Sequence, residues 1–127
     1  MPDLPDRPVR TVFIVDDDDE LAGAFARALA KRGYVVHRAR TGTEAVGMAG
    51  TFARLDAALV DLVLPGVGGL DVVRQVRSAH PACRIVAMTG LSDSAIESAF
   101  LTAGADRFLR KPMKLPDLFA ALDEPAA

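Results

Sequence analysis

Residues 11–19 read TVFIVDDDD, an apolar run that ends in four consecutive aspartates. The run is rich in β-branched and aromatic side chains and carries no charge, which is typical of a strand buried on both faces of a sheet. A cluster of negative charge therefore sits at the exit of a buried strand. In open α/β sheets ligands bind beyond the carboxyl ends of the strands, so this placement predicts a functional site.

Three further short runs, mostly apolar, end in side chains that can carry chemistry. These side chains are Asp61, Thr89 and Lys111. The runs before them read AALV, IVAM and FLR. Because parallel strands present their carboxyl ends at one edge of a sheet, we expect four strand ends to converge on one acidic pocket.

Strands alternate with amphipathic helices along the chain. The expected strands cover residues 11–15, 34–39, 56–60, 84–88 and 108–110. The expected helices cover residues 18–32, 43–53, 70–79, 96–103 and 115–122. Continuous apolar strands that alternate with amphipathic helices indicate an α/β fold, in which a parallel sheet is covered on both faces.

The composition bounds the class of protein. A chain of 127 residues fits one domain, and three prolines among residues 1–10 predict an extended leader before a domain over residues 11–127. A net charge of -2 argues against direct binding of nucleic acid. No apolar stretch approaches the ~20 residues of a membrane span, so we expect a cytoplasmic protein without a membrane partner. The single cysteine, Cys83, predicts a buried, unreactive thiol.

The acidic run divides into two parts. Asp18, Asp19 and Glu20 fall in the first turn of a predicted helix, where carboxylates cap free amides and complement the helix dipole. Asp16 and Asp17 stand at the mouth of the strand, where two carboxylates at ~4 Å repel by roughly 1 to 4 kcal/mol. A nearby cation is therefore expected.

Asp61 would complete a site of three carboxylates. Such an oxygen-only environment suits a hard ion such as Mg²⁺, and the absence of Cys or His nearby disfavours zinc. A carboxylate is also a competent nucleophile towards phosphorus, and a metal with an ammonium group neutralises the charge of a transferring phosphoryl group. Lys111 supplies such an ammonium group, and Thr89 a hydroxyl donor.

Four stretches together resemble the motifs of a known family. They are FIVDDD at 13–18, LVDLVLP at 59–65 with Gly69 following, VAMTG at 86–90 and FLRKP at 108–112. Over residues 11 to about 122 the chain resembles the receiver domain of bacterial two-component response regulators, as a single-domain protein or an amino-terminal receiver. The resemblance implies a flavodoxin-like, doubly wound, five-stranded parallel sheet with strand order 2-1-3-4-5 and five helices.

The resemblance also implies the roles of the acidic residues. Asp61 would accept a phosphoryl group from a phosphohistidine partner, either a sensor histidine kinase or a histidine phosphotransfer protein. Asp17 and Asp61 would ligate Mg²⁺ directly with the backbone carbonyl of Val63, and Asp16 would hold the ion largely through water. The chain would then be a regulatory phosphoacceptor and not a turnover enzyme.

The remaining motif residues are implied to form a switch. Lys111 would pair with the phosphoryl oxygens and Thr89 would hydrogen-bond one of them. Phe108 stands where relatives carry an aromatic side chain that changes rotamer with the threonine, although plain core packing is an equal interpretation. Phosphorylation would reshape the surface of helix four, strand five and helix five for a downstream protein target or a missing output domain. Relatives often have a cis bond before the residue equivalent to Pro112.

Two alternatives stay open. The run of Asp16 and Asp18 also fits the nucleophile pattern of haloacid-dehalogenase-like phosphatases. Those enzymes usually need a further acidic pair after the lysine, and this interpretation leaves Asp61 without a role. The second alternative is a pseudo-receiver that binds a partner without being phosphorylated.

Departures from the family pattern lead to further expectations. Gly68 replaces an acidic residue common in relatives, which predicts a loop with unusual backbone freedom. Val63 and Leu91 are apolar where some relatives orient an attacking water, which predicts a long-lived aspartyl phosphate. A short last helix is expected to expose Phe119 or Leu122, consistent with a monomer or weak dimer.

Overall fold

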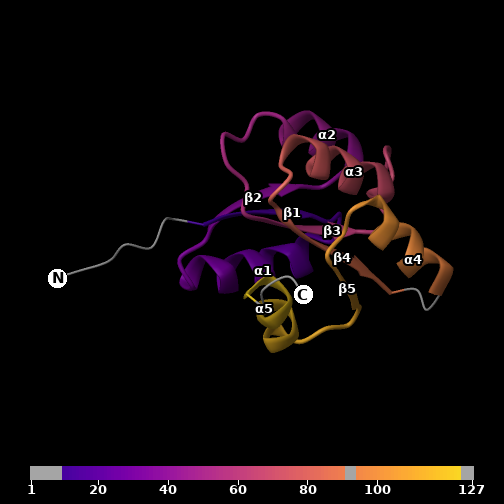
Figure 1. Ribbon diagram of the computed structural model, residues 1–127. Helices are drawn as coiled ribbons and strands as arrows, with labels where there is room; N and C mark the ends of the chain where they lie inside the picture. The colour runs from indigo at the N-terminus through magenta and orange to yellow at the C-terminus, as the bar shows by residue number, and fades with distance from the viewer. Residues whose placement is uncertain (1–9, 91–93, 124–127) are drawn as a thin grey trace.

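The computed structural model describes residues 10–90 and 94–123. Within them, five parallel strands form one sheet in the order β2-β1-β3-β4-β5 (Figure 1). The strands are β1 (Thr11–Val15), β2 (Val35–Ala39), β3 (Ala57–Asp61), β4 (Arg84–Thr89) and β5 (Arg107–Arg110). The predicted flavodoxin-like topology is confirmed.

Helices cover both faces of the sheet. They are α1 (Asp19–Lys31), α2 (Gly42–Ala49), α3 (Gly69–Ala79), α4 (Ser94–Ala103) and α5 (Leu115–Asp123). α1 and α5 pack on one face, and α2, α3 and α4 pack on the other (Figure 1). Within the described residues, no helix is long and apolar enough to cross a membrane.

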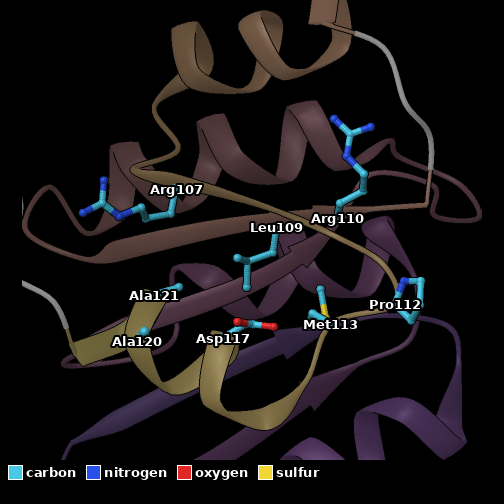
Figure 2. Close-up of a pocket in the computed structure, with 8 residues that line it drawn as sticks. All are labelled: Arg107, Leu109, Arg110, Pro112, Met113, Asp117, Ala120 and Ala121. Atoms are coloured by element: carbon cyan, nitrogen blue, oxygen red, sulfur yellow. The ribbon is translucent and has the colours of Figure 1, made fainter.

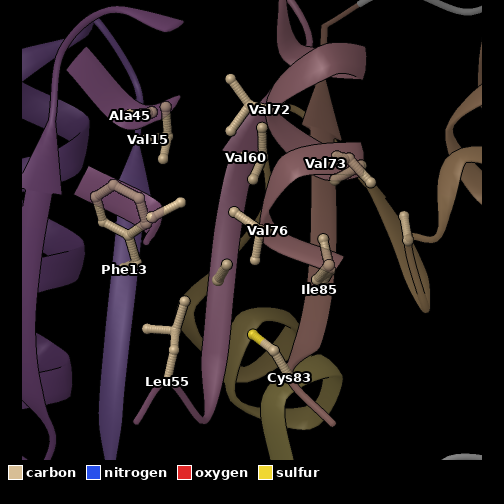
Figure 3. Packing of buried hydrophobic residues seen from close by; sticks show 14 of the residues in the cluster. Phe13, Val15, Ala45, Leu55, Val60, Val72, Val73, Val76, Cys83 and Ile85 are labelled. Carbon is tan, nitrogen blue, oxygen red and sulfur yellow. The ribbon is translucent and has the colours of Figure 1, made fainter. Parts of the chain in front are cut away.

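The central strands build a core on each side of the sheet. Val12 and Ile14 of β1 face the cluster under α1 and α5, whereas Phe13 and Val15 face the cluster under α2 and α3. Figure 3 shows the second cluster, in which Phe13 and Val15 of β1 share one side of the sheet with Ala45 of α2 and Val76 of α3. Each fully buried side chain of this size contributes about 1.5 to 3 kcal/mol, so both faces hold the strand in place.

Two sequence-based expectations about helix ends are wrong. Helix α2 ends at Ala49 and not at residue 53, because Gly50 forms the C-cap and the hydroxyl of Thr51 donates to a carbonyl of the last turn. Phe52 then leaves the helix, and its ring centroid lies 5.0 Å from that of Phe13. Leu122 is buried in α5 with 5% of its surface exposed.

Phe119 is also covered. It is half-buried, and the guanidinium carbon of Arg32 lies 4.1 Å above the centre of its ring. The expected exposure of the last helix is therefore not observed. Cys83 is buried as predicted, and burial raises the pKa of its thiol to about 12, so the thiol stays protonated.

Candidate functional site

The parallel sheet brings the predicted strand ends to one edge. Asp16 directly follows β1, Asp61 is the last residue of β3, Thr89 is the last of β4, and Lys111 directly follows β5. The backbone N–H of Lys111 donates to the carbonyl of Thr89 at 2.6 Å, which extends the pairing of β4 with β5 into the site. Carboxylate oxygens of Asp16, Asp17 and Asp61 all lie within 4.8 Å of one another.

Lys111 bridges two of these carboxylates. Its Nζ lies 2.8 Å from Oδ2 of Asp16 and 3.0 Å from Oδ2 of Asp61. Asp16 and Asp61 are 1% and 6% exposed, whereas Asp17 is exposed. Opposite charges at this distance and burial attract strongly, so the ammonium group offsets part of the repulsion between the carboxylates.

Backbone amides hold the second oxygen of each buried carboxylate. The N–H of Asp18 donates to Oδ1 of Asp16 at 2.9 Å, and the N–H of Val63 donates to Oδ1 of Asp61 at 3.2 Å. Both carboxylates are thus fixed in orientation by one amide and one ammonium group. Such fixed geometry is what a site for group transfer requires.

The charge states of the bridge follow from burial and neighbours. Burial and the neighbouring charge of Asp16 raise the pKa of Asp61, and together they outweigh the opposing effect of Lys111 and of the Val63 amide. Burial acts to lower the pKa of Lys111, but its bonds to Asp16 and Asp61 outweigh burial and leave that pKa raised. Lys111 therefore stays a cation.

The three carboxylates form a donor set of oxygen atoms alone. Hard divalent cations such as Mg²⁺ prefer carboxylate and carbonyl oxygens, and the exposed Asp17 leaves one side of the group open to solvent. The residues present therefore fit a magnesium site.

The rest of the acidic run serves the helix, as expected. Oδ1 of Asp18 accepts the N–H of Leu21 at 3.1 Å and forms the N-cap of α1, and Asp19 and Glu20 lie in its first turn. Asp18 lies outside the group of three carboxylates. The Asp18 carboxylate thus caps α1, which differs from the role that a haloacid-dehalogenase-like site would give it.

The two predicted switch residues lie on the side of β4 and β5. Thr89 is buried at the carboxyl end of β4. Phe108 is half-buried in β5, with its ring centroid 6.0 Å from that of Phe100 in an edge-on arrangement. The peptide bond between Lys111 and Pro112 is cis. These positions are compatible with the predicted switch role, which stays a prediction.

One glycine of the loop after Asp61 uses a backbone conformation that favours glycine. Gly66 has the left-handed backbone with φ 77°, whereas Gly68 has φ -71°, which any residue adopts. Val63 points to solvent and is 61% exposed. Leu91 is the other apolar residue from which a long-lived aspartyl phosphate is predicted, and it lies outside the described residues.

Two glycines fix the loops around the site: Gly69, which the sequence motif already included, and Gly42, which sequence reasoning missed. A Cβ at Gly69 would lie 2.3 Å from the carbonyl oxygen of Asp61, and a Cβ at Gly42 would lie 1.6 Å from that of Val67. Both positions therefore admit only glycine without a backbone shift. Gly42 follows Thr41, whose hydroxyl caps α2 by accepting the N–H of Glu44. The Thr-Gly pair at the start of the helix could have indicated this position from the sequence.

A separate cavity of about 340 Å³ lies between β5 and α5 (Figure 2). Leu109 and Met113 supply apolar surface, and Arg107, Arg110 and Asp117 supply charge. The cavity belongs to the surface where the predicted switch would be read.

Comparison with known proteins places this geometry in a family. The chain matches the model of the response regulator receiver domain over residues 12–123. It therefore belongs to the receiver domains of two-component response regulators. The response regulator MprA of a Mycobacterium species is 36% identical over 115 residues, which cover 91% of this chain and 49% of that protein.

Another relative carries a different activity in its name. A cyclic di-GMP phosphodiesterase of Thermotoga maritima is 37% identical over 105 residues, which are 83% of this chain and 28% of that protein. The chain thus spans about half, or less, of the length of these two relatives. The name of this relative refers to the whole of that protein, of which the matched part is 28%.

Solved structures agree in fold. A response regulator from Burkholderia pseudomallei, solved with a phosphorylated aspartic acid, calcium and citrate, superposes with a TM-score of 0.85 at 32% identity, covering 92% of this chain and 68% of that one. A receiver domain from Methanospirillum hungatei gives a TM-score of 0.83 at 27% identity, covering 88% and 89%.

Proposed function

We propose that this receiver domain is a phosphorylation-operated switch of a two-component system, with Asp61 as the phosphoacceptor. The observation that carries the proposal is the position of Asp61, whose carboxylate lies within 4.8 Å of oxygens of Asp16 and Asp17 and 3.0 Å from the ammonium group of Lys111. A nucleophile, a metal-ligand set and a cation thus meet at one strand end.

The phosphoryl transfer follows from these positions. A carboxylate oxygen of Asp61 attacks phosphorus, the N–P bond of a phosphohistidine breaks, and the electron pair of that bond leaves with the imidazole. Asp16, Asp17, Asp61 and the backbone carbonyl of Val63 would hold Mg²⁺. When bound, the ion neutralises charge on the phosphoryl oxygens. Lys111 balances the remaining negative charge of the aspartyl phosphate.

The proposed output is a change in surface. Thr89 turns its hydroxyl towards a phosphoryl oxygen on Asp61, and Phe108 follows it inward, which alters the surface of α4, β5 and α5. A downstream protein target, or an output domain in a longer protein, then binds one state better, by no more than its differential affinity for the two states.

We further propose a set of partners and properties. The phosphodonor is a sensor histidine kinase or a histidine phosphotransfer protein, and the domain works in the cytoplasm as a monomer or weak dimer without direct contact with nucleic acid or membrane. The domain catalyses only its own phosphorylation and dephosphorylation. The extended leader expected over residues 1–10 lies, up to residue 9, outside the described residues.

The test is a phosphorylation assay with Mg²⁺ and acetyl phosphate. We expect one acid-stable, base-labile adduct at Asp61, located by mass spectrometry, and none in Asp61→Asn. Asp71→Asn is the matched control, because it removes an exposed carboxylate of α3 outside the site. An adduct at Asp16 would support a phosphatase-like site, and no adduct would support a pseudo-receiver.

The phosphoryl group on Asp61 is proposed to be long-lived. The exposed Val63 side chain offers no polar atom to orient an attacking water beside the acceptor. We expect Val63→Asn to shorten the lifetime severalfold in a dephosphorylation time course, and Leu91→Glu to act in the same direction. Equal or slower loss in the variants would count against the proposal.

A further inference from the structure

A second cavity lies beside Asp17. It has a volume of about 530 Å³ and is lined by residues of three segments. Asp17 comes from the loop after β1, Arg40 from the corner between β2 and α2, Glu44 from the first turn of α2, and Pro65 from the loop that follows Asp61. The cavity therefore adjoins the group of three carboxylates.

The corner between β2 and α2 is fixed against the loop after Asp61. The N–H of Gly42 donates to the carbonyl of Pro65 at 3.1 Å. The two segments approach so closely that a Cβ on Gly42 would lie 1.6 Å from the carbonyl oxygen of Val67. The backbone of Arg40, two residues earlier, is thus held at a constant position relative to the acceptor strand.

The guanidinium group of Arg40 is oriented but not enclosed. Its Nη2 lies 2.9 Å from Oδ2 of Asp19, and its side chain is 66% exposed. The backbone N–H of Arg40 donates to Oε1 of Glu44 at 2.7 Å, which ties that carboxylate to the main chain. Within residues 10–90 and 94–123, Asp19 is the one side chain paired with this guanidinium, which has five N–H donors.

A phosphodonor must carry negative charge into an acidic site. Asp16, Asp17 and Asp61 repel an incoming phosphoryl anion, and Lys111 is already shared between two of them. A guanidinium group at the cavity beside Asp17 offers N–H donors that match the oxygens of a phosphoryl group.

We propose that Arg40 is a donor-binding residue that contacts the anionic phosphodonor beside Asp17. This inference rests on the proposed function of Asp61. With acetyl phosphate, the O–P bond of the donor breaks, acetate leaves with the electron pair, and a new O–P bond forms to Asp61. Arg40 binds the donor's phosphoryl oxygens before this step and takes no part in bond breaking.

The experiment measures the rate of Asp61 phosphorylation against acetyl phosphate concentration with saturating Mg²⁺. We expect Arg40→Ala to raise the half-saturating concentration roughly three- to tenfold, with little change in the maximal rate, because an exposed charged contact is worth a modest factor. Arg40→Lys should recover part of the loss. The difference should shrink at high ionic strength.

Arg38→Ala is the matched control. Arg38 lies in β2, two residues before Arg40, its Nη2 lies 3.5 Å from Oδ1 of Asp19, and it does not line the cavity beside Asp17. An unchanged half-saturating concentration in Arg40→Ala, or an equal rise in Arg38→Ala, would overturn the role of Arg40 while the adduct at Asp61 still forms. Failure of the wild-type chain to form that adduct would overturn the proposed function and this role with it.

Discussion

The buried carboxylate of Asp61 shares the ammonium group of Lys111 with a second carboxylate, that of Asp16. Its pKa is raised by burial, so its contribution to stability is present below the ordinary value of about 3.9 and is lost as pH rises through the folded pKa. In neutral, metal-free buffer the charge of Asp61 therefore destabilises the fold. A neutral replacement at this position leaves Lys111 and Asp16 as a balanced pair.

We predict that Asp61→Asn is more stable than the wild type in neutral, metal-free buffer, by about 1 kcal/mol. Urea unfolding with and without Mg²⁺ measures this. The ion should stabilise the wild type and have much less effect on the variant, because one of its ligands is lost. Asp71→Asn, an exposed site, should stay within about 0.5 kcal/mol of the wild type in both buffers. A destabilised Asp61→Asn would contradict the prediction.

Two glycines of helix α2 differ in the space around them, so they should respond oppositely to substitution by alanine. At Gly42 an added Cβ would meet the backbone of Val67, whereas at Gly47 it would meet nothing within 4 Å. We predict that Gly42→Ala destabilises the fold by about 2 kcal/mol or more, because two backbone segments must separate. Gly47→Ala should stabilise it by roughly 0.5 to 1 kcal/mol through helix propensity.

Thermal and urea unfolding of the two variants measure the contrast. Gly42→Ala should also weaken Mg²⁺ binding, because the displaced loop begins at Asp61 and includes Val63. Equal stability of the two variants would show that the loop moves aside at no cost.

Arg77 joins helix α3 to the turn that directly follows it and to the turn after α4. Its guanidinium donates to the carbonyls of Gly104 at 2.7 Å, Cys83 at 2.7 Å and Pro81 at 2.8 Å, and pairs with Asp106 at 2.8 Å. We predict that Arg77→Met destabilises the fold by about 2 to 4 kcal/mol, because it removes the side-chain donor from the partly buried carbonyls of Gly104 and Cys83.

Urea unfolding tests this, with Arg74→Met as the control on the same helix. Arg74 makes an exposed pair with Asp71, so its loss should cost about 0.5 kcal/mol or less. Arg77→Lys should resemble Arg77→Met, since one ammonium group cannot reproduce the planar set of donors. A stable Arg77→Lys would show that charge alone suffices.

The elements themselves were largely predictable, and the exceptions have local causes. The apolar run of β1 predicts a buried strand, and this prediction is confirmed. The end of α2 was missed because the apolar spacing continues to Ala53, whereas Gly50 stops the helix. The loop after Asp61 was expected to have unusual backbone freedom, but the sequence did not reveal that Gly66 is the glycine that adopts a positive φ.

At the scale of the molecule, the site was predictable because topology alone brings strand ends together. The pairing of Lys111 with Asp16 as well as Asp61 was not, because several acceptors lay within its expected reach. Contacts such as that of Arg10 with Asp123 were also beyond prediction. They join common charged residues from opposite ends of the chain, and no motif marks them.

Asp123, the last residue of α5, is the centre of a polar network that joins the end of α5 to residues beside β1, α1 and β2. The Tyr34 hydroxyl donates to its Oδ1 at 2.9 Å, and Arg10 and Arg32 pair with it at 3.1 and 2.9 Å. Burial acts to raise the pKa of Asp123, but these three donors outweigh burial and lower it. Burial and the bond to Asp123 raise the pKa of Tyr34 to about 12.

These shifts predict a stability difference between wild type and Tyr34→Phe of about 1 kcal/mol that is largest between roughly pH 5 and 9. Below that window, the stability that the lowered pKa of Asp123 contributes is lost as pH falls through this pKa. The variant loses less stability there, because it lacks the Tyr34 hydrogen bond that helps to lower the pKa of Asp123. Above about pH 10 the phenol ionises in the unfolded chain before it does in the folded one, so the wild type loses stability up to about pH 12.

Urea unfolding across this pH range measures the loss of stability at low and at high pH. Tyr34 is the single tyrosine of the sequence, so ultraviolet absorbance reports its ionisation directly. A difference that persists unchanged at high pH, or a phenol that titrates at its ordinary pKa, would show that the network does not hold in solution.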